Sequence, residues 1–191
     1  MDENSTQLQN IPVQFHQDAE QKEFSNCTFC GNDLGTTTPY VIEKSIKYNR
    51  EKKVRMTVFE YAICQACSIK KMQAMSTESV KNIQAYMQEN VLSEMQAKLT
   101  EKTTFEDKTS SCPVTGASME DMDEYSMVGQ FIGNKMIVRE FPFVINASVG
   151  EEMQDLLSVE TKKEFDDFMD TITGIPPELK SLFKTNRPVL V

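Results

Sequence analysis

The chain has 191 residues, 39% of them hydrophobic, and a formal net charge of −9 at pH 7. This length allows one or two small domains, and no apolar run approaches the ~18 residues that a membrane-spanning helix needs. The negative charge argues against a protein that coats nucleic acid along its whole surface.

The first segment, residues 1–22, is polar and rich in glutamine, and it is predicted to be a flexible tail. Its start is acidic and has neither the basic nor the apolar region of a signal peptide, so a cytoplasmic protein is expected. The single histidine, His16, lies in this segment and is expected to be a solvated surface residue.

Four of the five cysteines form two C-x-x-C pairs that are separated by 33 residues. Two residues between cysteines let one tight turn aim both sulfurs at one ion, and a second pair can complete a tetrahedron. We therefore predict one structural Zn²⁺ whose coordination sphere is filled by four thiolates. The predicted ligands are Cys27, Cys30, Cys64 and Cys67.

Three other interpretations of these cysteines stay open. Disulfides belong mainly to oxidising compartments, and an odd count of five leaves one cysteine unpaired. A redox C-x-x-C of the thioredoxin type is expected inside a βαβ pattern. An iron–sulfur cluster also needs four cysteines, although the common ferredoxin spacings place three of them close together.

A β-hairpin is predicted between the two cysteine pairs. Residues 40–48 and 54–63 are rich in β-branched and aromatic residues, and the polar residues 49–53 lie between them. A knuckle made by the first pair and Gly31, then this hairpin, then the second pair at a helix start resemble the treble-clef class of zinc fingers over about residues 27–75. The resemblance implies a fold for this segment and a structural zinc. It implies no single activity, because treble clefs bind DNA, RNA or proteins, or serve stability alone.

A second helix is predicted over residues 76–99, because Ser76 can cap its start and apolar residues recur at helical spacing. The apolar stripe consists of Val80, Ile83, Met87, Val91, Met95 and Leu99. Packing of this stripe within the chain is the simpler interpretation, and a homodimer through paired helices is the alternative. Methionines such as Met87 and Met95 suit either a core or an adaptable contact surface.

Residues 101–126 are polar and acidic, with a turn-like stretch at Cys112–Gly116, and they are predicted to form an acidic linker. Cys112 is a candidate nucleophile, but the usual Cys–His pair would depend on His16 alone. No glycine-rich phosphate-binding motif is present, and we find no internal repeat. An enzyme is therefore the least favoured class of protein.

The C-terminal part, residues 127–191, is predicted to be a small α+β unit. Gly133-Asn134 between two strand-like runs predicts a hairpin, and Pro142 suggests an edge strand or a bulge. A helix is predicted over residues 161–172, and a last short helix over residues 178–184. The fold class is therefore α+β, with a treble-clef-like zinc module and its following helix at residues 23–100, ahead of the linker and the C-terminal unit.

Positive charge is concentrated in the predicted zinc module. Residues 27–71 have a net charge of +4, so the rest of the chain sums to −13. The hairpin 44–55 is the centre of this patch, which suits phosphates, an acidic protein segment, or the chain's own acidic residues. The candidate contact residues are Lys47, Arg50, Lys52, Lys53 and Arg55.

The sequence favours a non-catalytic protein-interaction or adaptor module built on a structural zinc site. The alternative function is a nucleic-acid-binding regulator that uses the basic hairpin, and an enzyme of unknown type is the second alternative. A protein partner is expected ahead of nucleic acid, and no association with a membrane is expected.

Overall fold

A single antiparallel β-sheet forms the centre of this α+β protein, whose computed structural model describes residues 7–93, 104–139 and 141–173. The strands run in the order β1–β5–β4–β2–β3, and β6 pairs with a different stretch of β4 from β5. Their bounds are β1 Gln7–Asn10, β2 Tyr40–Asn49, β3 Val54–Cys64, β4 Glu124–Ile132, β5 Lys135–Val138 and β6 Phe143–Asn146.

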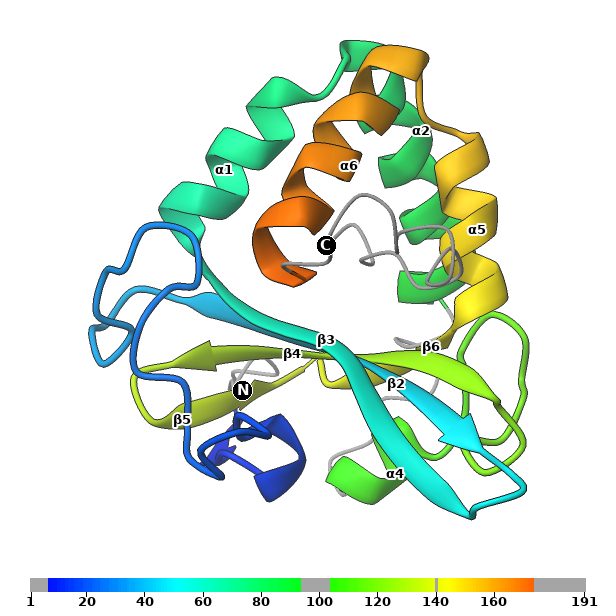
Figure 1. Cartoon of the computed structure of the whole chain (residues 1–191). Coiled ribbons are helices and arrows are strands. Elements are labelled where there is room, and N and C mark those ends of the chain that lie inside the picture. The colour runs from blue at the N-terminus through cyan, green and yellow to red at the C-terminus, as the bar shows by residue number, and fades with distance from the viewer. Residues whose placement is uncertain (1–6, 94–103, 140, 174–191) are drawn as a thin grey trace, which may run out of the picture.

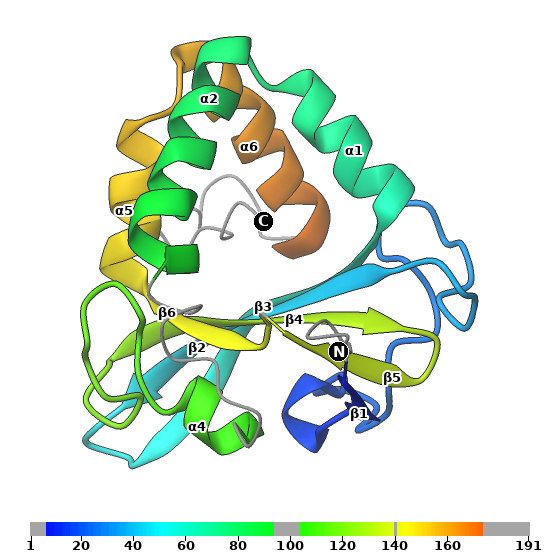
Figure 2. The same cartoon turned by 180° about the vertical axis from the view of Figure 1, so that it is seen from behind.

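Four helices cover one face of the sheet, whereas the N-terminal segment and the short α4 lie on the other face (Figure 1). Figure 2 shows the same two layers from behind, with α1 and α5 at opposite sides of the helical layer. The bounds are η1 Val13–Phe15, α1 Gln65–Ala74, α2 Thr77–Tyr86, the π-helical η2 Met87–Leu92, α4 Phe105–Thr109, α5 Ala147–Asp155 and α6 Val159–Thr173. No helix within these described ranges is long and apolar enough to cross a membrane.

Residues 7–22 are packed against the sheet, whereas residues 1–22 were expected to form a flexible tail. The strand β1 pairs with β5, and the side chain of Phe15 is fully buried. The Phe15 ring meets Phe131 edge-on at 5.0 Å, and a Cβ on Gly129 would lie 2.8 Å from its Cζ atom. Glycine at position 129 therefore gives Phe15 room to reach the sheet backbone. Because the segment is polar in composition, nothing in the sequence indicated that Phe15 would be fully buried.

One sheet contains strands from both sides of the expected linker at residues 101–126. The strands β2 and β4 pair over eight residue pairs, from Tyr40 with Phe131 to Lys47 with Glu124. The helix α4 and the first residues of β4 also lie inside the range expected as linker. The acidic composition here reflects exposed loop residues, while Met122 and Tyr125 between them are buried.

Both predicted hairpins are confirmed, as β2–β3 and as β4–β5. The helix predicted over residues 76–99 begins as expected, because the Ser76 side chain caps α2 and η2 continues it. The described part of its apolar stripe packs within the chain, since Ile83, Met87 and Val91 are buried. Met95, Leu99 and the last helix predicted at residues 178–184 lie outside the described residues.

Candidate metal centre

The four predicted ligand cysteines lie together in the structure. Their sulfur atoms are all within 4.8 Å of one another, and the Cys30 and Cys64 sulfurs are 3.7 Å apart. A tetrahedral ion with metal–sulfur bonds of about 2.3 Å has sulfur–sulfur edges of about 3.8 Å. The cluster therefore fits one metal ion held by four thiolates: Cys27, Cys30, Cys64 and Cys67.

The first pair lies on a knuckle, residues 26–33, whose shape depends on a glycine. Gly31 has a φ of +72° and donates its N–H to the Cys27 carbonyl oxygen at 2.9 Å. A Cβ at this position would have no atom within 4 Å, so glycine is required by the backbone angle rather than by space. This turn aims the sulfurs of Cys27 and Cys30 at the same point.

The knuckle is attached to the end of β3 by two hydrogen bonds. The Thr28 N–H donates to the Ala62 carbonyl oxygen at 2.9 Å, and the Ala62 N–H donates to Thr28 Oγ1 at 3.0 Å. Two residues further along, Cys64 is the last residue of β3 and the N-cap of α1. Cys67 follows in the first turn of that helix, so the centre joins a loop, a strand end and a helix start.

Backbone N–H groups favour the thiolate form of one cysteine. Burial raises the pKa of Cys27, but hydrogen bonds from the N–H groups of Cys64, Cys30 and Phe29 outweigh it and lower this pKa to about 7. Burial and the neighbouring thiols raise the pKa of Cys64 and of Cys67. Several thiolates at such short range need a compensating cation, and a metal ion supplies that charge.

A cavity of about 360 Å³ adjoins Cys67 between α1 and α6. The ring of Phe29 on the knuckle stacks on that of Phe168 at a centroid distance of 4.7 Å. The Nζ atom of Lys71 lies 3.1 Å from the Phe168 centroid and 4.4 Å from that of Phe165. Burial lowers the pKa of Lys71 to about 7, although nearby Glu43 opposes this shift. These contacts tie α6, from the C-terminal half, to the metal centre.

The structure places the predicted basic patch at one end of the β2–β3 hairpin, beside the chain's own acidic loop. The Arg50 Nε atom lies 2.5 Å from Asp123 Oδ1, and its Nη2 donates to the Asp121 carbonyl oxygen at 2.6 Å. Lys47 forms an ion pair with Glu124. Two of the five predicted contact residues are therefore already paired within the molecule.

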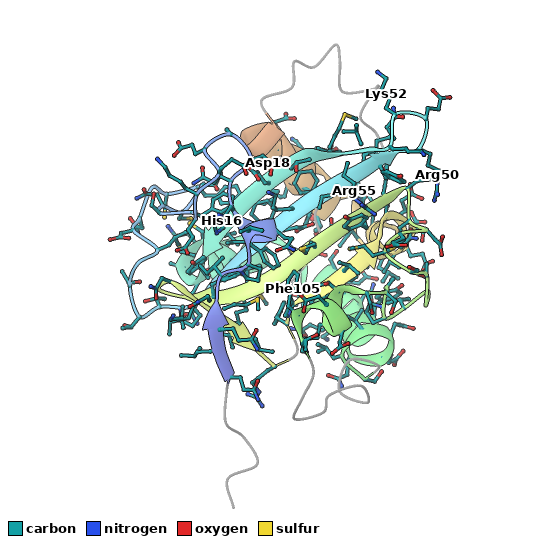
Figure 3. All side chains as sticks on the ribbon, turned by 90° about the horizontal axis from the view of Figure 1, so that it is seen from below. His16, Asp18, Arg50, Lys52, Arg55 and Phe105 are labelled. Atoms are coloured by element: carbon teal, nitrogen blue, oxygen red, sulfur yellow. The ribbon has the colours of Figure 1, made fainter. Side chains whose placement is uncertain are left out.

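The other three residues of the basic patch are Lys52, Lys53 and Arg55, and all three are exposed. Figure 3 shows Arg50, Lys52 and Arg55 at the same end of the hairpin. The Arg55 guanidinium stacks on the Tyr48 ring at 4.9 Å. Among the five residues of the basic patch, those without an acidic partner are thus Lys52, Lys53 and Arg55, at the hairpin tip.

Sequence reasoning missed a charge network around one buried lysine on the sheet face opposite the helices. Lys44 lies in the interior of β2, with its ammonium 2.5 Å from Asp18 Oδ1 and 2.9 Å from Glu60 Oε2. It also donates to the His16 carbonyl oxygen at 2.6 Å. The available signal was one opposite charge in the interior of each predicted strand, and Lys44 and Glu60 do occupy paired positions.

His16 and Cys112 do not form a catalytic pair of the usual kind. His16 is half-buried rather than solvated, and its Nε2 atom is buried without a hydrogen-bond partner. Figure 3 shows it beside Asp18 on the N-terminal segment. Cys112 is fully buried, lies outside the four-cysteine cluster, and accepts a hydrogen bond from the Thr115 N–H at 3.5 Å.

Comparisons with protein-family models, with curated proteins and with solved structures find no match to this chain. The fold and the site define the class directly: an α+β protein with a candidate four-cysteine metal centre at the junction of a knuckle, a strand and a helix.

Proposed function

We propose that this chain is a cytoplasmic, non-catalytic binding module held together by one structural Zn²⁺. The observation that carries the proposal is the set of four cysteine sulfurs within 4.8 Å of one another. Four thiolates fill a tetrahedral sphere and leave no open position for a substrate or an activated water, which a catalytic zinc needs. Free thiols in this number suit a reducing compartment.

The order of elements around the ion supports a treble-clef type of site. A knuckle supplies Cys27 and Cys30, the β2–β3 hairpin follows, and α1 begins with Cys64 and Cys67. No side chain of α1 is fully buried, and Cys67 and Lys71 are half-buried. Apolar packing alone therefore contributes little to its position, and the ion is the main anchor of α1 in this proposal.

The outer face of α1, defined by Ile69 and Met72, is the proposed contact surface for a protein partner. Ile69 and Met72 are 47% and 44% exposed and lie three residues apart, so they share one side of the helix. Two exposed apolar side chains on one side of a helix suit an apolar segment of a protein partner.

The alternative, binding to nucleic acid through the hairpin, has weaker support. Lys47 and Arg50 already pair with acidic residues of the same chain, and the whole molecule carries a net charge of −9. Only the hairpin tip keeps unpaired exposed charge among the five predicted residues. Phosphate contacts by so few residues predict weak binding with a shallow dependence on salt.

The test compares two matched double variants in photo-cross-linking from a probe residue on α1, with partners identified by mass spectrometry. The variant Ile69→Asp/Met72→Asp is expected to lose partners that wild type and Lys52→Glu/Lys53→Glu both retain, including at ~0.3 M salt. Binding of labelled single-stranded or duplex nucleic acid that only Lys52→Glu/Lys53→Glu abolishes would instead establish the alternative function.

A further inference from the structure

The loop at Cys112 has the same backbone structure as the knuckle at Cys27. In each loop the glycine four residues after the cysteine donates its N–H to the cysteine carbonyl oxygen at 2.9 Å. The N–H of each cysteine donates to the carbonyl oxygen of the residue five positions later, at 2.8 Å in the knuckle and 2.9 Å in the second loop. The two glycines have nearly equal φ angles, +72° for Gly31 and +70° for Gly116.

The hydrogen bonds that flank the two loops also correspond. The Leu34 N–H donates to the Ser25 carbonyl oxygen at 2.9 Å, and the Met119 N–H donates to the Ser110 carbonyl oxygen at 2.8 Å. Each residue of the second bond lies 85 positions after its counterpart, which is also the separation of Cys112 from Cys27. Isolated bridges close both loops at the same two positions, at Asn26–Asp33 and Ser111–Ser118.

The strands after each loop follow the same plan. Tyr40 and Tyr125 each lie 13 residues after the cysteine of their loop. Tyr40 pairs with Cys64, the residue before α1, and Tyr125 pairs with Asn146, the residue before α5. Each loop is thus followed by a strand, by an antiparallel return, and by a helix that begins at the same point of the pairing.

An approximate two-fold axis relates the first loop and the elements that follow it to the second loop and its own following elements. Glu43 of β2 faces Val128 of β4, and these two residues are again 85 positions apart. The antiparallel register of β2 and β4 is therefore symmetric about this pair. A rotation about an axis through the pair, perpendicular to the sheet, exchanges β2 with β4 and keeps all four helices on one face, as Figure 1 and Figure 2 show.

Equivalent residues of the helices are 82 positions apart instead of 85. The reason is that the chain from Tyr125 to its partner Asn146 is three residues shorter than the chain from Tyr40 to its partner Cys64. Ser76 caps α2, and Ser158 occupies the equivalent position before α6. The Ser76 N–H donates to Thr161 Oγ1 at 3.0 Å, and the Ser158 N–H donates to Ser79 Oγ at 2.9 Å. This reciprocal pair of hydrogen bonds joins the two copies where their helices begin.

We propose that the chain contains two copies of one metal-binding unit and that the second copy, built around Cys112, has lost three of its four ligands. Thr115, Asn146 and Val149 occupy the positions of the ligands Cys30, Cys64 and Cys67. No repeat was expected from the sequence, because outside a few positions the two copies share almost no residues. The matching backbone of the two loops and their strands argues for one.

Apolar packing replaces the metal in the second copy. The helix α5 buries Val149, Gly150 and Met153, whereas its counterpart α1 buries no residue. Val149 stands where Cys67 binds the ion, so a methyl-bearing side chain fills the ligand position. The second unit is therefore the metal-independent half of the molecule, and its backbone still has the conformation of the four-cysteine site.

The test restores the three ligands in the full chain as Thr115→Cys/Asn146→Cys/Val149→Cys and counts zinc by elemental analysis after removal of free metal. One more zinc per chain than in wild type is expected. The control Ala117→Cys/Ala147→Cys/Ser148→Cys adds the same number of thiols at non-equivalent positions and is expected to match wild type. A folded triple variant with the wild-type zinc content would overturn the proposal.

Val149→Cys also removes a buried apolar side chain, so a second variant guards against misfolding. Thr115→Cys/Asn146→Cys keeps Val149 and offers three thiolates with Cys112. Titration with Co²⁺ is expected to give thiolate-to-cobalt absorption for one more equivalent than in wild type, and a titration identical to wild type contradicts the proposal.

The proposed repeat rests on the proposed zinc site of the first copy. The wild-type zinc content tests that site, and the difference between variant and wild type tests the repeat.

Discussion

Gly31 and Gly116 show how a single residue type determines the backbone of both loops. Each adopts a positive φ with nothing within 4 Å of the site of a Cβ. A side chain at either position therefore costs conformational energy without a steric clash. The composition of the two loops differs, and the shared glycine is the feature that preserves their shape.

Gly31→Ala and Gly116→Ala are each expected to lower the free energy of unfolding by about 1–2 kcal/mol, because an L-residue resists the left-handed region. Urea unfolding of the zinc-loaded protein measures both. Only Gly31→Ala is expected to weaken zinc binding in a chelator competition. Gly31→Asn is the control and should lose less, since asparagine tolerates this conformation better. Equal losses for alanine and asparagine would contradict the backbone explanation.

Asp18 is expected to contribute to stability in a pH-dependent way. Burial raises its pKa, but hydrogen bonds from Lys44 and Thr57 and the charge of Lys44 outweigh this effect, so the pKa is lowered. The contribution is present above the ordinary pKa of an aspartate and is lost as the pH falls through the lowered value. Asp18→Asn should cost at most about 1 kcal/mol at neutral pH, because Asp18 is half-exposed.

Unfolding curves of wild type and Asp18→Asn measured from neutral to acidic pH check this expectation. The two free energies should converge in acid. Glu20→Gln changes an exposed residue in the same segment and should follow wild type throughout. A constant difference between wild type and Asp18→Asn at every pH would show that charge is not the cause.

At the scale of elements, local patterns predicted the hairpins and helix starts well. Alternation and turn residues indicated β2–β3 and β4–β5, and Ser76 marked the start of α2. The same patterns gave no sign that β2 pairs with β4, because a register between distant strands is a property of tertiary packing. The cluster of four cysteines was predictable from spacing alone. The proposed second copy was not, since three of its four equivalent positions are not cysteine.

The hydrogen bonds at the starts of α2 and α6 are expected to contribute equally to the free energy of unfolding. Ser79→Ala and Thr161→Val each leave one part-buried backbone N–H without its acceptor, which costs about 1 kcal/mol, the low end of the penalty for an unsatisfied donor. Chemical denaturation measures the two losses. The exposed Ser148, on α5, supplies the control Ser148→Ala, for which no comparable loss is expected. A large loss in one variant and none in the other would show that the two positions are not equivalent.

At the scale of the whole molecule, the two copies exchange helices and share one sheet. Phe168 of α6 packs on Phe29 of the knuckle, and Tyr86 of α2 donates to Glu152 of α5 at 2.7 Å. Each copy is thus stabilised by the second helix of the other. This arrangement explains how α1 and α6 lie together at the metal centre although 84 residues separate the end of α1 from the start of α6.

Removal of the metal is expected to act unevenly across the molecule. A strong chelator should first abolish amide-exchange protection in α1 and the knuckle, because the ion is their main anchor. Protection in α5 and in the Cys112 loop should persist longer, since apolar packing holds them. Hydrogen exchange followed by mass spectrometry resolves these segments. Simultaneous loss of protection in both loops would contradict a metal-independent second copy.

The most direct test of a four-thiolate structural zinc is X-ray absorption at the zinc edge, on protein purified without added metal. We predict about one zinc per chain with four sulfur neighbours at about 2.3 Å and no oxygen or nitrogen neighbour. Replacement of Cys112 by serine should leave this spectrum unchanged. A shell with oxygen or nitrogen ligands, or protein without metal and with oxidised cysteine pairs, would contradict a four-thiolate zinc site.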